Sequence, residues 1–371
     1  MELPEHLLAQ IFSPLSFQDK LHVTWVCRRW RNVFWKAPGL WAAVPLDVSK
    51  ISSAISASCC KETDAHIFCS VLHICRWLTK RSIDGGLTSL LLTASFEEGV
   101  GKESESDQQL AQVLAFLLPT LAATVGNNCV PLHLTLSGSA ALSGLSGEVF
   151  SQLAHIQSLE SLSLTASGDS EHRVVSMPVR AMACLENLKE VSLTSVTLPG
   201  SEDQMRGLGL LTGMERLALQ KCKLEQDEAG PTFTACLGRM HRLADLCMQG
   251  SAIYAILSLG MQLERLSLAA MDLTNLPGMA ALQRLQHLDI ARNELRKVPD
   301  GLHHLTCLSY LDMSRQSRRF QMHGPLTFLA SMPCLATLIV QPQPQGHEVL
   351  YSVPLVKTAN ICFLSKNVEA S

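Results

Sequence analysis

One short stretch of the sequence gathers residue types that can bind a metal ion. Between positions 59 and 75 lie four cysteines and two histidines: Cys59, Cys60, His66, Cys69, His73 and Cys75. Thiolate and imidazole groups are the usual ligands of structural zinc. No C-x2-C pair opens the set, and His66, Cys69 and His73 have a spacing that places them on one face of a helix. We therefore interpret them as side chains of a half-buried helix and expect neither a metal nor a cofactor.

A second group of residues could bind anions. Arg315, Arg318 and Arg319 occur in the segment RQSRR. Guanidinium groups can bind phosphate or carboxylate oxygens through two parallel hydrogen bonds. A solvated basic loop between two repeats explains the same residues more simply, and both interpretations stay open.

No pattern in the chain indicates catalysis. The sequence contains no G-x4-G-K-S/T, H-E-x-x-H or G-x-S-x-G segment. The formal net charge of the 371 residues is −3, which gives no electrostatic support for binding to nucleic acid or to a membrane surface. We expect a binding protein that is not an enzyme, with neither nucleic acid nor membrane as a partner.

The elements that must position these residues follow from a repeated pattern, L-x-x-L-x-L. Eight clear copies begin at Leu159, Leu188, Met214, Leu243, Leu263, Leu285, Leu308 and Leu335. Their starts lie 20 to 29 residues apart, which is the period of leucine-rich repeats. The predicted fold class is therefore α/β: a leucine-rich-repeat solenoid, in which short strands form a curved parallel sheet and helices or turns form the return legs.

The solenoid is expected to span residues 87–345, with about ten repeats. Less regular copies begin near Leu87 and around Leu132, and the short repeats from Leu263 to Leu308 should have tight return legs. Residues 97–109 and 341–348 have the composition of exposed loops. Residues 346–371 are expected to form a C-terminal cap and tail.

The third and fifth residues of each L-x-x-L-x-L copy alternate away from the buried side of the strand. The earlier copies carry mainly small residues at these positions, whereas the copies from Leu263 onward carry bulky and charged ones. Arginine, tyrosine and histidine are the best interface anchors among them. We predict a protein-binding surface that comprises Arg265, His287, Asp289, Tyr310 and Asp312, with Arg315, Arg318 and Arg319 at its edge.

The first 45 residues predict three short helices rather than repeats. In LPEHLLAQIF the apolar residues recur at helical spacing, and Pro4 suits the first turn. Trp25, Trp30, Trp35 and Trp41 lie within 17 residues. Three short helices cannot bury four tryptophans, which indicates either a partner site or docking onto the next domain.

At these residues the sequence resembles a known motif. Leu3-Pro4, Leu7-Leu8, Ile11-Phe12, Leu15, Asp19, Val26-Cys27, Arg29-Trp30 and Leu40-Trp41 match the F-box pattern in order and spacing, over residues 2–45. Lys20 departs from the leucine that usually follows the aspartate. Together with the repeats, the chain resembles the F-box/leucine-rich-repeat family.

The resemblance implies a substrate-recognition subunit of a Skp–cullin–F-box E3 ubiquitin ligase. In that family the F-box binds a Skp-type adaptor, and through it a cullin, while the inner face of the repeats binds a protein substrate. Carried over to this sequence, the adaptor-binding residues are Leu3, Pro4, Leu7, Leu8, Ile11, Phe12, Leu15, Val26, Cys27 and Trp30. Two alternatives stay open: a repeat scaffold or inhibitor with an F-box-like helical cap, and a co-receptor that binds a small ligand.

Residues 46–86 are expected to connect the two parts. DVSKISSAISASCCKETD is small and polar and predicts a partial loop, and HIFCSVLHICRWLTKR predicts an amphipathic helix. We expect Trp77 and Leu78 of that helix to cap the first repeat, whose leucines would otherwise face water. The acidic N-terminus, the lack of an N-x-S/T sequon and the odd number of 13 cysteines predict the reducing cytoplasm or nucleus.

Overall fold

The structure is a computed structural model, and it describes only part of the chain. The described residues are 3–15, 17–37, 40, 42–57, 64–83, 87–96, 105–124, 130–138, 153, 156–166, 185–198, 208–224, 230–251, 262–276, 278–317, 320, 332–340 and 360–363. They fall into two compact units: residues 1–170 with 184–188, and residues 171–183 with 189–371.

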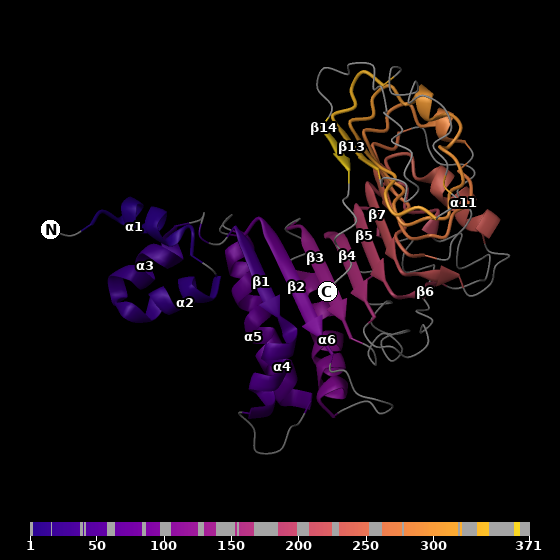
Figure 1. The fold of residues 1–371 in the computed structure, drawn as a ribbon. Coiled ribbons are helices and arrows are strands. Elements are labelled where there is room, and N and C mark those ends of the chain that lie inside the picture. The colour runs from indigo at the N-terminus through magenta and orange to yellow at the C-terminus, as the bar shows by residue number, and fades with distance from the viewer. Residues whose placement is uncertain are drawn as a thin grey trace, which may run out of the picture. The chain divides into compact units, whose positions relative to one another are not determined.

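Three short helices open the first unit, as the sequence predicts (Figure 1). They are α1 (Glu5–Phe12), α2 (Phe17–Val26) and α3 (Arg28–Lys36). The backbone of Cys27 is extended (φ −158°), which separates α2 from α3, and its sulfur accepts a hydrogen bond from the backbone N–H of Trp30 at 3.5 Å. The described buried side chains of the trio are Leu8, Phe12, Val23, Thr24, Val33 and Phe34.

A parallel sheet of the first unit follows, and it begins earlier than Leu87, the expected start of the solenoid. Its strands, in spatial order, are β1 (Ala43–Asp47), β2 (Ser89–Ser95), β3 (Leu132–Ser137) and β4 (Leu159–Thr165). β1 pairs with β2 residue for residue, from Ala43 beside Ser89 to Asp47 beside Thr93. Pro45 lacks an N–H group, and β1 tolerates it because an edge strand pairs on one side only.

Three helices pack on one face of β1–β3 and leave the opposite face open (Figure 1). They are α4 (Val48–Ala57), α5 (Asp64–Ile83) and α6 (Glu105–Thr124). α4 lies in the segment expected to be partly loop, and α6 starts at Glu105, so the end of the loop expected at 97–109 is helical. Leu78 of α5 is fully buried, which agrees with a capping role for this helix.

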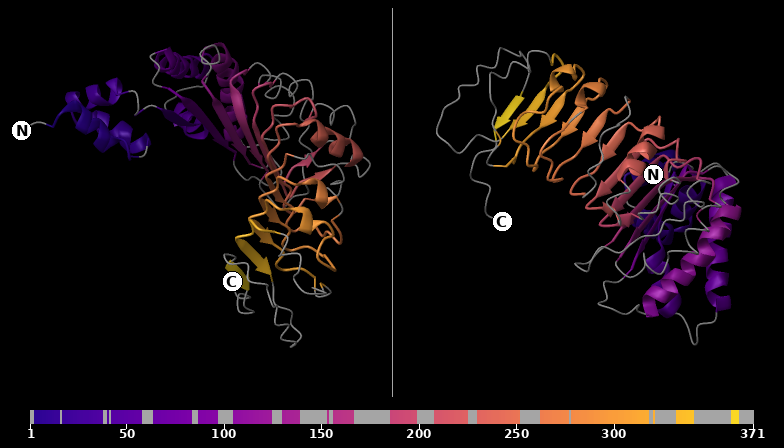
Figure 2. Two further views of the ribbon diagram at one scale, coloured as in Figure 1. Left: turned by 90° about the horizontal axis from the view of Figure 1, so that it is seen from above. Right: turned by 90° about the vertical axis from the view of Figure 1, so that its right-hand side faces the viewer.

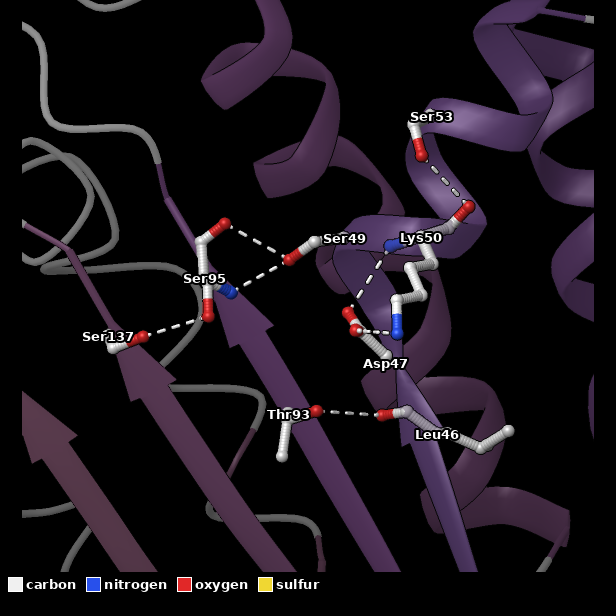
Figure 3. A network of polar contacts seen from close by, with 8 residues as sticks. All are labelled: Leu46, Asp47, Ser49, Lys50, Ser53, Thr93, Ser95 and Ser137. Atoms are coloured by element: carbon white, nitrogen blue, oxygen red, sulfur yellow. Dashed lines mark hydrogen bonds and ion pairs between the residues drawn. The ribbon is translucent and has the colours of Figure 1, made fainter. Parts of the chain in front are cut away.

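Side chains complete the transition from β1 to α4 (Figure 3). Asp47 accepts a hydrogen bond from the backbone N–H of Lys50 at 3.3 Å and forms an ion pair with its ammonium group at 3.3 Å. The Ser49 hydroxyl accepts from the N–H of Ser95 (2.8 Å) and donates to its carbonyl (3.0 Å). Because β1 has already ended, this hydroxyl satisfies the two backbone groups that a further β1 residue would otherwise pair with.

The second unit contains the main repeat array (Figure 2, orange and yellow strands). Its parallel sheet comprises, in spatial order, β5 (Glu190–Thr194), β7 (Arg216–Gln220), β9 (Asp245–Cys247), β10 (Arg265–Ser267), β11 (His287–Asp289), β12 (Tyr310–Asp312), β13 (Thr337–Val340) and β14 (Asn360–Phe363). β6 (Thr197–Leu198) and β8 (Lys223–Leu224) form a separate small sheet. β14 falls in the segment expected to be a cap and tail.

The pattern residues of all eight clear copies are at most 4% exposed. The predicted leucine-rich-repeat fold is therefore confirmed. The return legs also follow repeat length as predicted. α11 (Gly230–Arg239) precedes β9 in a long repeat, whereas the described return legs before β11 and β12 contain the 3-10 turns η4 (Met279–Ala281) and η5 (Leu302–His304).

The turns after six strands contain residues with a left-handed backbone. The φ angle lies between 54° and 65° at Ser195, Lys221, Gly250, Ala270, Arg292 and Arg315, and the turn of Ala270 contains a second such residue, Asp272 (φ 53°). Gly250 is a glycine, and each of the other residues carries a strain of about 1 kcal/mol. Hydrogen bonds to the next repeat offset it, as between the N–H of Arg292 and the carbonyl of Ser314 (2.9 Å).

In several of these turns the side chain of the residue after the left-handed position binds backbone groups of its own or the preceding repeat. The amide of Asn293 donates to the carbonyls of Leu268 (2.8 Å) and Ile290 (2.9 Å), and its oxygen accepts from two N–H groups. Gln316 donates to the carbonyl of Ile290 at 2.7 Å, and the Ser251 hydroxyl donates to that of Leu219 at 2.6 Å. Gln316 and Ser251 therefore have roles equivalent to that of Asn293 in their own turns.

We predict that Asn293→Ala lowers the free energy of unfolding by about 3 kcal/mol, because it leaves several buried backbone groups without partners. Asn293 is 3% exposed, so water cannot replace the lost amide. Urea unfolding followed by circular dichroism measures the change. Gln283→Ala, at an exposed position of a nearby turn, is the control and should change stability by less than about 0.5 kcal/mol. Equal effects of the two substitutions would contradict the assigned role.

Candidate functional site

Helix α1 carries apolar side chains on two of its faces. Leu8 and Phe12 are 3% and 1% exposed and belong to the core of the helical trio. Leu7 and Ile11, one turn apart on another face, are 37% and 53% exposed, and Leu3, which precedes the helix, is 49% exposed. This second face serves no packing need of the three helices.

The end of α2 adds two more exposed apolar side chains. Trp25 is 75% exposed and Val26 is 62% exposed. The two parts are linked, because the guanidinium of Arg29, just after the α2–α3 turn, donates a hydrogen bond to the carbonyl of Leu3. Five of the seven large exposed apolar side chains among the described residues therefore lie in this trio. We call them the N-terminal apolar surface: Leu3, Leu7, Ile11, Trp25 and Val26.

The structure divides the ten adaptor-binding residues that the resemblance implies. Leu3, Leu7, Ile11 and Val26 lie on the N-terminal apolar surface, and Pro4 and Cys27 are also exposed. Four others have inward or half-buried positions: Leu8, Phe12, Leu15 and Trp30. The Trp30 ring packs against that of Phe12, with centroids 5.2 Å apart. Trp25 is absent from the implied set, although its size and its place beside Val26 could have indicated it.

The excess of tryptophan at the N-terminus has two destinations. Trp25 is on the surface, whereas Trp35 contacts Trp77 of α5 edge to face, with ring centroids 6.2 Å apart and an interplanar angle of 79°. This contact joins the helical trio to the helix that covers the first strands. Docking onto the next domain therefore accounts for Trp35, while the exposed Trp25 remains a candidate for a partner site. Trp41 lies outside the described residues.

The outward face of the second unit begins with a row of paired charges. Glu190 and Arg216 are register partners on β5 and β7, and their side chains form an ion pair at 2.9 Å. Asp245 and Arg265, on β9 and β10, form a second pair at 3.9 Å. Such exposed cross-strand pairs contribute about 0.5 kcal/mol each and neutralise the charge of this part of the face.

The same row continues with two aromatic rings. His287 and Tyr310 are register partners on β11 and β12, and their rings are stacked at a centroid distance of 4.1 Å and an interplanar angle of 6°. Burial lowers the pKa of His287 below its usual value of 6.5, and Arg265 acts in the same direction, while Asp289 opposes both. We therefore expect a neutral imidazole beside the phenol ring at neutral pH.

Two carboxylates come two residues after the rings on the same strands. Asp289 and Asp312 are register partners on the same two strands. Asp289 accepts hydrogen bonds from the N–H of Ala291 (3.0 Å) and the hydroxyl of Ser267 (3.2 Å), and Asp312 accepts one from the N–H of Ser314 (2.8 Å). In the part of the chain that the structure describes, neither aspartate forms an ion pair.

Five of the eight residues predicted for the protein-binding surface thus lie together on β10, β11 and β12. We call this group the β10–β12 face: Arg265, His287, Asp289, Tyr310 and Asp312. Arg315 is exposed in the turn after β12. Arg318 and Arg319 lie outside the described residues, so the structure does not show whether they extend the face.

The described part of the cysteine–histidine stretch has the character of a packed helix. On α5, His73 is exposed, whereas Cys75 is buried, and burial raises the pKa of its thiol to about 12. Cys59, Cys60 and the side chains of His66 and Cys69 lie outside the description. Within the described residues, no three histidine, cysteine or acidic side chains come together as metal ligands. No described helix is both long enough and apolar enough to span a bilayer.

Comparison with known proteins found one matching family model and several similar solved structures. The F-box-like family model matches residues 1–44. Among solved structures, an internalin of Listeria monocytogenes superposes with a TM-score of 0.48 at 15% identity, covering 86% of this chain and 88% of that one. A leucine-rich-repeat protein of Leptospira interrogans superposes with a TM-score of 0.47 at 17% identity, covering 77% of this chain and 62% of that one. A search of curated proteins gave no significant match.

The family match and the buried repeat pattern together define the architecture. An F-box-like region of 44 residues precedes a leucine-rich-repeat array. Both are protein-interaction modules that are typically not catalytic. The chain is thus built to bind other proteins.

We predict that nuclear magnetic resonance titration of His287 gives a pKa below 6.5, because burial disfavours the charged ring. Asp289→Asn should lower this pKa further, since it removes a negative charge that favours protonation, and Arg265→Gln should raise it. The folded state should lose stability as the pH falls from 6.5 towards the native pKa of this histidine. A pKa at or above 6.5, a raised pKa in Asp289→Asn or a lowered pKa in Arg265→Gln would contradict the assigned environment.

Proposed function

We propose that this protein is the substrate-recognition subunit of a Skp–cullin–F-box E3 ubiquitin ligase. In this proposal the N-terminal apolar surface binds a Skp-type adaptor, which connects it to a cullin. The β10–β12 face, with Arg315, Arg318 and Arg319 at its edge, holds the protein substrate. The chain itself performs no chemical step, and its contribution is to hold a substrate near the ligase.

The observation that carries the proposal is the second apolar face of α1. A helix that packs only against its neighbours needs one apolar stripe, which Leu8 and Phe12 supply. Leu3, Leu7 and Ile11 remain 37–53% exposed. Burying a leucine or isoleucine side chain on a partner contributes roughly 1.5–3 kcal/mol, and an exposed tryptophan such as Trp25 is a frequent anchor of interfaces. A solvent-facing cap would gain nothing from these residues.

The contact between Trp35 and Trp77 supports the proposal that the F-box-like region and the repeats act together. It ties α3 to α5, and α5 belongs to the helical layer that covers the first strands. A partner bound to the N-terminal apolar surface is therefore held next to the beginning of the repeats. In the proposed ligase, this arrangement links adaptor binding to substrate binding.

We predict that the double substitution Leu7→Lys with Ile11→Lys weakens binding to a Skp-type adaptor by about 4 kcal/mol, roughly a thousandfold. Both side chains are exposed, so the charged residues should not disturb the helical core. Co-purification with the adaptor, followed by calorimetric titration, measures the effect. Leu8→Ala is unsuitable as a test, because Leu8 is 3% exposed and its loss would destabilise the trio itself.

Leu210→Lys is the matched control, since Leu210 is 54% exposed and lies outside the F-box-like region. It should leave adaptor binding unchanged, and circular dichroism should show both variants to be folded. If the wild-type chain does not bind the adaptor, or if the double variant binds equally well, the F-box-like helices act as a cap and the proposal fails.

We also propose a cytoplasmic or nuclear location. No disulfide joins any two of the seven cysteines whose side chains the structure describes: Cys27, Cys75, Cys222, Cys236, Cys247, Cys307 and Cys334. Cys75 and Cys222 are buried, and burial raises their pKa values to about 12 and about 11. Free buried thiols are ordinary in a reducing compartment, where they act as small apolar side chains.

We predict that thiol titration of the denatured, unreduced protein finds all 13 cysteines free. In the native protein the exposed Cys27, Cys307 and Cys334 should react first. Cys75 and Cys222 should react last, because burial disfavours their thiolates. Several stable disulfides in protein purified under thiol-blocking conditions would contradict the proposed location.

A further inference from the structure

We infer that the β10–β12 face binds a segment of its protein partner through a basic side chain, an arginine or a lysine. The inference rests on the proposed function, in which this face holds the substrate. It goes further by naming the chemistry of the segment that is recognised.

Charge is distributed unevenly over the outward face of the second unit. Glu190 is neutralised by Arg216, and Asp245 lies within 3.9 Å of Arg265. On the described strands β5–β12, the outward carboxylates of Asp289 and Asp312 form no ion pair. The net negative charge of this sheet face is therefore concentrated on β11 and β12.

The two carboxylates lie side by side on the sheet. They are register partners on adjacent parallel strands, which lie about 4.8 Å apart. Backbone and hydroxyl donors already orient both groups, through Ala291, Ser267 and Ser314. Two fixed carboxylates at this spacing can both reach one guanidinium or ammonium group, and hydrogen bonds of this charged kind are the stronger ones.

Aromatic and apolar side chains surround the two carboxylates. The stacked rings of His287 and Tyr310 stand on the same two strands as the carboxylates. A cation is attracted to the face of such a neutral ring, and arginine also stacks on it. Ile339, the register partner of Asp312 on β13, offers apolar surface for the methylene groups of a long basic side chain.

Arginines near the β10–β12 face do not make it favour an acidic ligand over a basic one. Arg265 is engaged with Asp245, and Arg292 and Arg315 are exposed in the turns beyond the strand ends. In the described structure neither of these two turn arginines forms an ion pair with Asp289 or Asp312. A phosphorylated or acidic segment would have to lie against two carboxylates, which costs free energy, whereas a basic side chain neutralises them.

The test selects ligands from a displayed library of random dodecapeptides on the full-length protein. The selection runs in parallel on wild type, on Asp289→Asn with Asp312→Asn, and on a control, Asp272→Asn with Asp300→Asn. The asparagine oxygens can keep the hydrogen bonds of the two aspartates, so the face should stay folded. The control removes the same charge from exposed positions outside the strands.

We expect arginine or lysine to be enriched at one peptide position on wild type and on the control, and not on the Asp289/Asp312 variant. A synthetic copy of an enriched peptide should bind that variant at least about tenfold more weakly. Tyr310→Ala should have an effect of similar size, while Tyr310→Phe, which keeps the ring, should bind like wild type.

Enrichment of acidic or apolar peptides, equal enrichment on the two aspartate variants, or no enrichment above an unrelated protein would overturn the inference. Adaptor co-purification, measured on the same preparations, separates this outcome from failure of the proposed function. Intact adaptor binding without a basic preference overturns the inference alone. A basic preference in a chain that does not bind the adaptor overturns the ligase function alone.

Discussion

A single repeat of this chain cannot bury its own pattern residues, and the rest of the molecule depends on neighbouring repeats covering them. The side chains of Leu266, Leu288 and Leu311 are fully buried because each is stacked between the same residues of adjacent repeats. Burial of this row fixes the strand register, since a shift by one residue would turn the leucines outward. The outward residues then align without any direct selection for their contacts.

The alignment has a direct consequence for binding. Arg265, His287 and Tyr310 are about 20 residues apart in sequence, yet they are register partners on consecutive strands. A side chain at one position of the pattern therefore acquires two fixed neighbours, and a binding surface can be changed by substitutions that leave the core untouched. The left-handed turns and the side chains of Ser251, Asn293 and Gln316 hold the strand ends in this spacing.

Much of this arrangement could be predicted from the sequence, because periodicity reports burial. The eight repeat starts and the outward positions of the β10–β12 face follow from the L-x-x-L-x-L spacing alone. β1 could not be predicted, since AVPLD has no repeat pattern and contains a proline that only its edge position tolerates. Helix α4 could not be predicted either, because its serines and alanines are small and its helical pattern is weak.

The site was harder to predict than the fold. In α1, Leu7 and Leu8 are adjacent leucines of the same motif, and the sequence cannot decide which one faces the core. The structure decides it through Phe12 and Phe34, which complete the buried side that Leu8 joins. Similarly, the composition of the outward face indicates anchors but not their pairing. The ion pair between Asp245 and Arg265, and the stacking of His287 on Tyr310, depend on register and rotamers that only the assembled sheet defines.

The two interaction surfaces of the chain differ in physical kind, and the difference suits their proposed roles. The N-terminal apolar surface offers leucine, isoleucine and tryptophan, whose burial favours a stable contact with one constant partner. The β10–β12 face offers half-buried charges and rings, which give less affinity per contact but reject partners of the wrong charge. A recognition subunit needs both properties, because its adaptor stays the same while its substrate must be distinguished from other proteins and then released. Placing the apolar contacts on helices and the polar ones on the repeat strands keeps the two requirements separate, so that either surface can vary without altering the other.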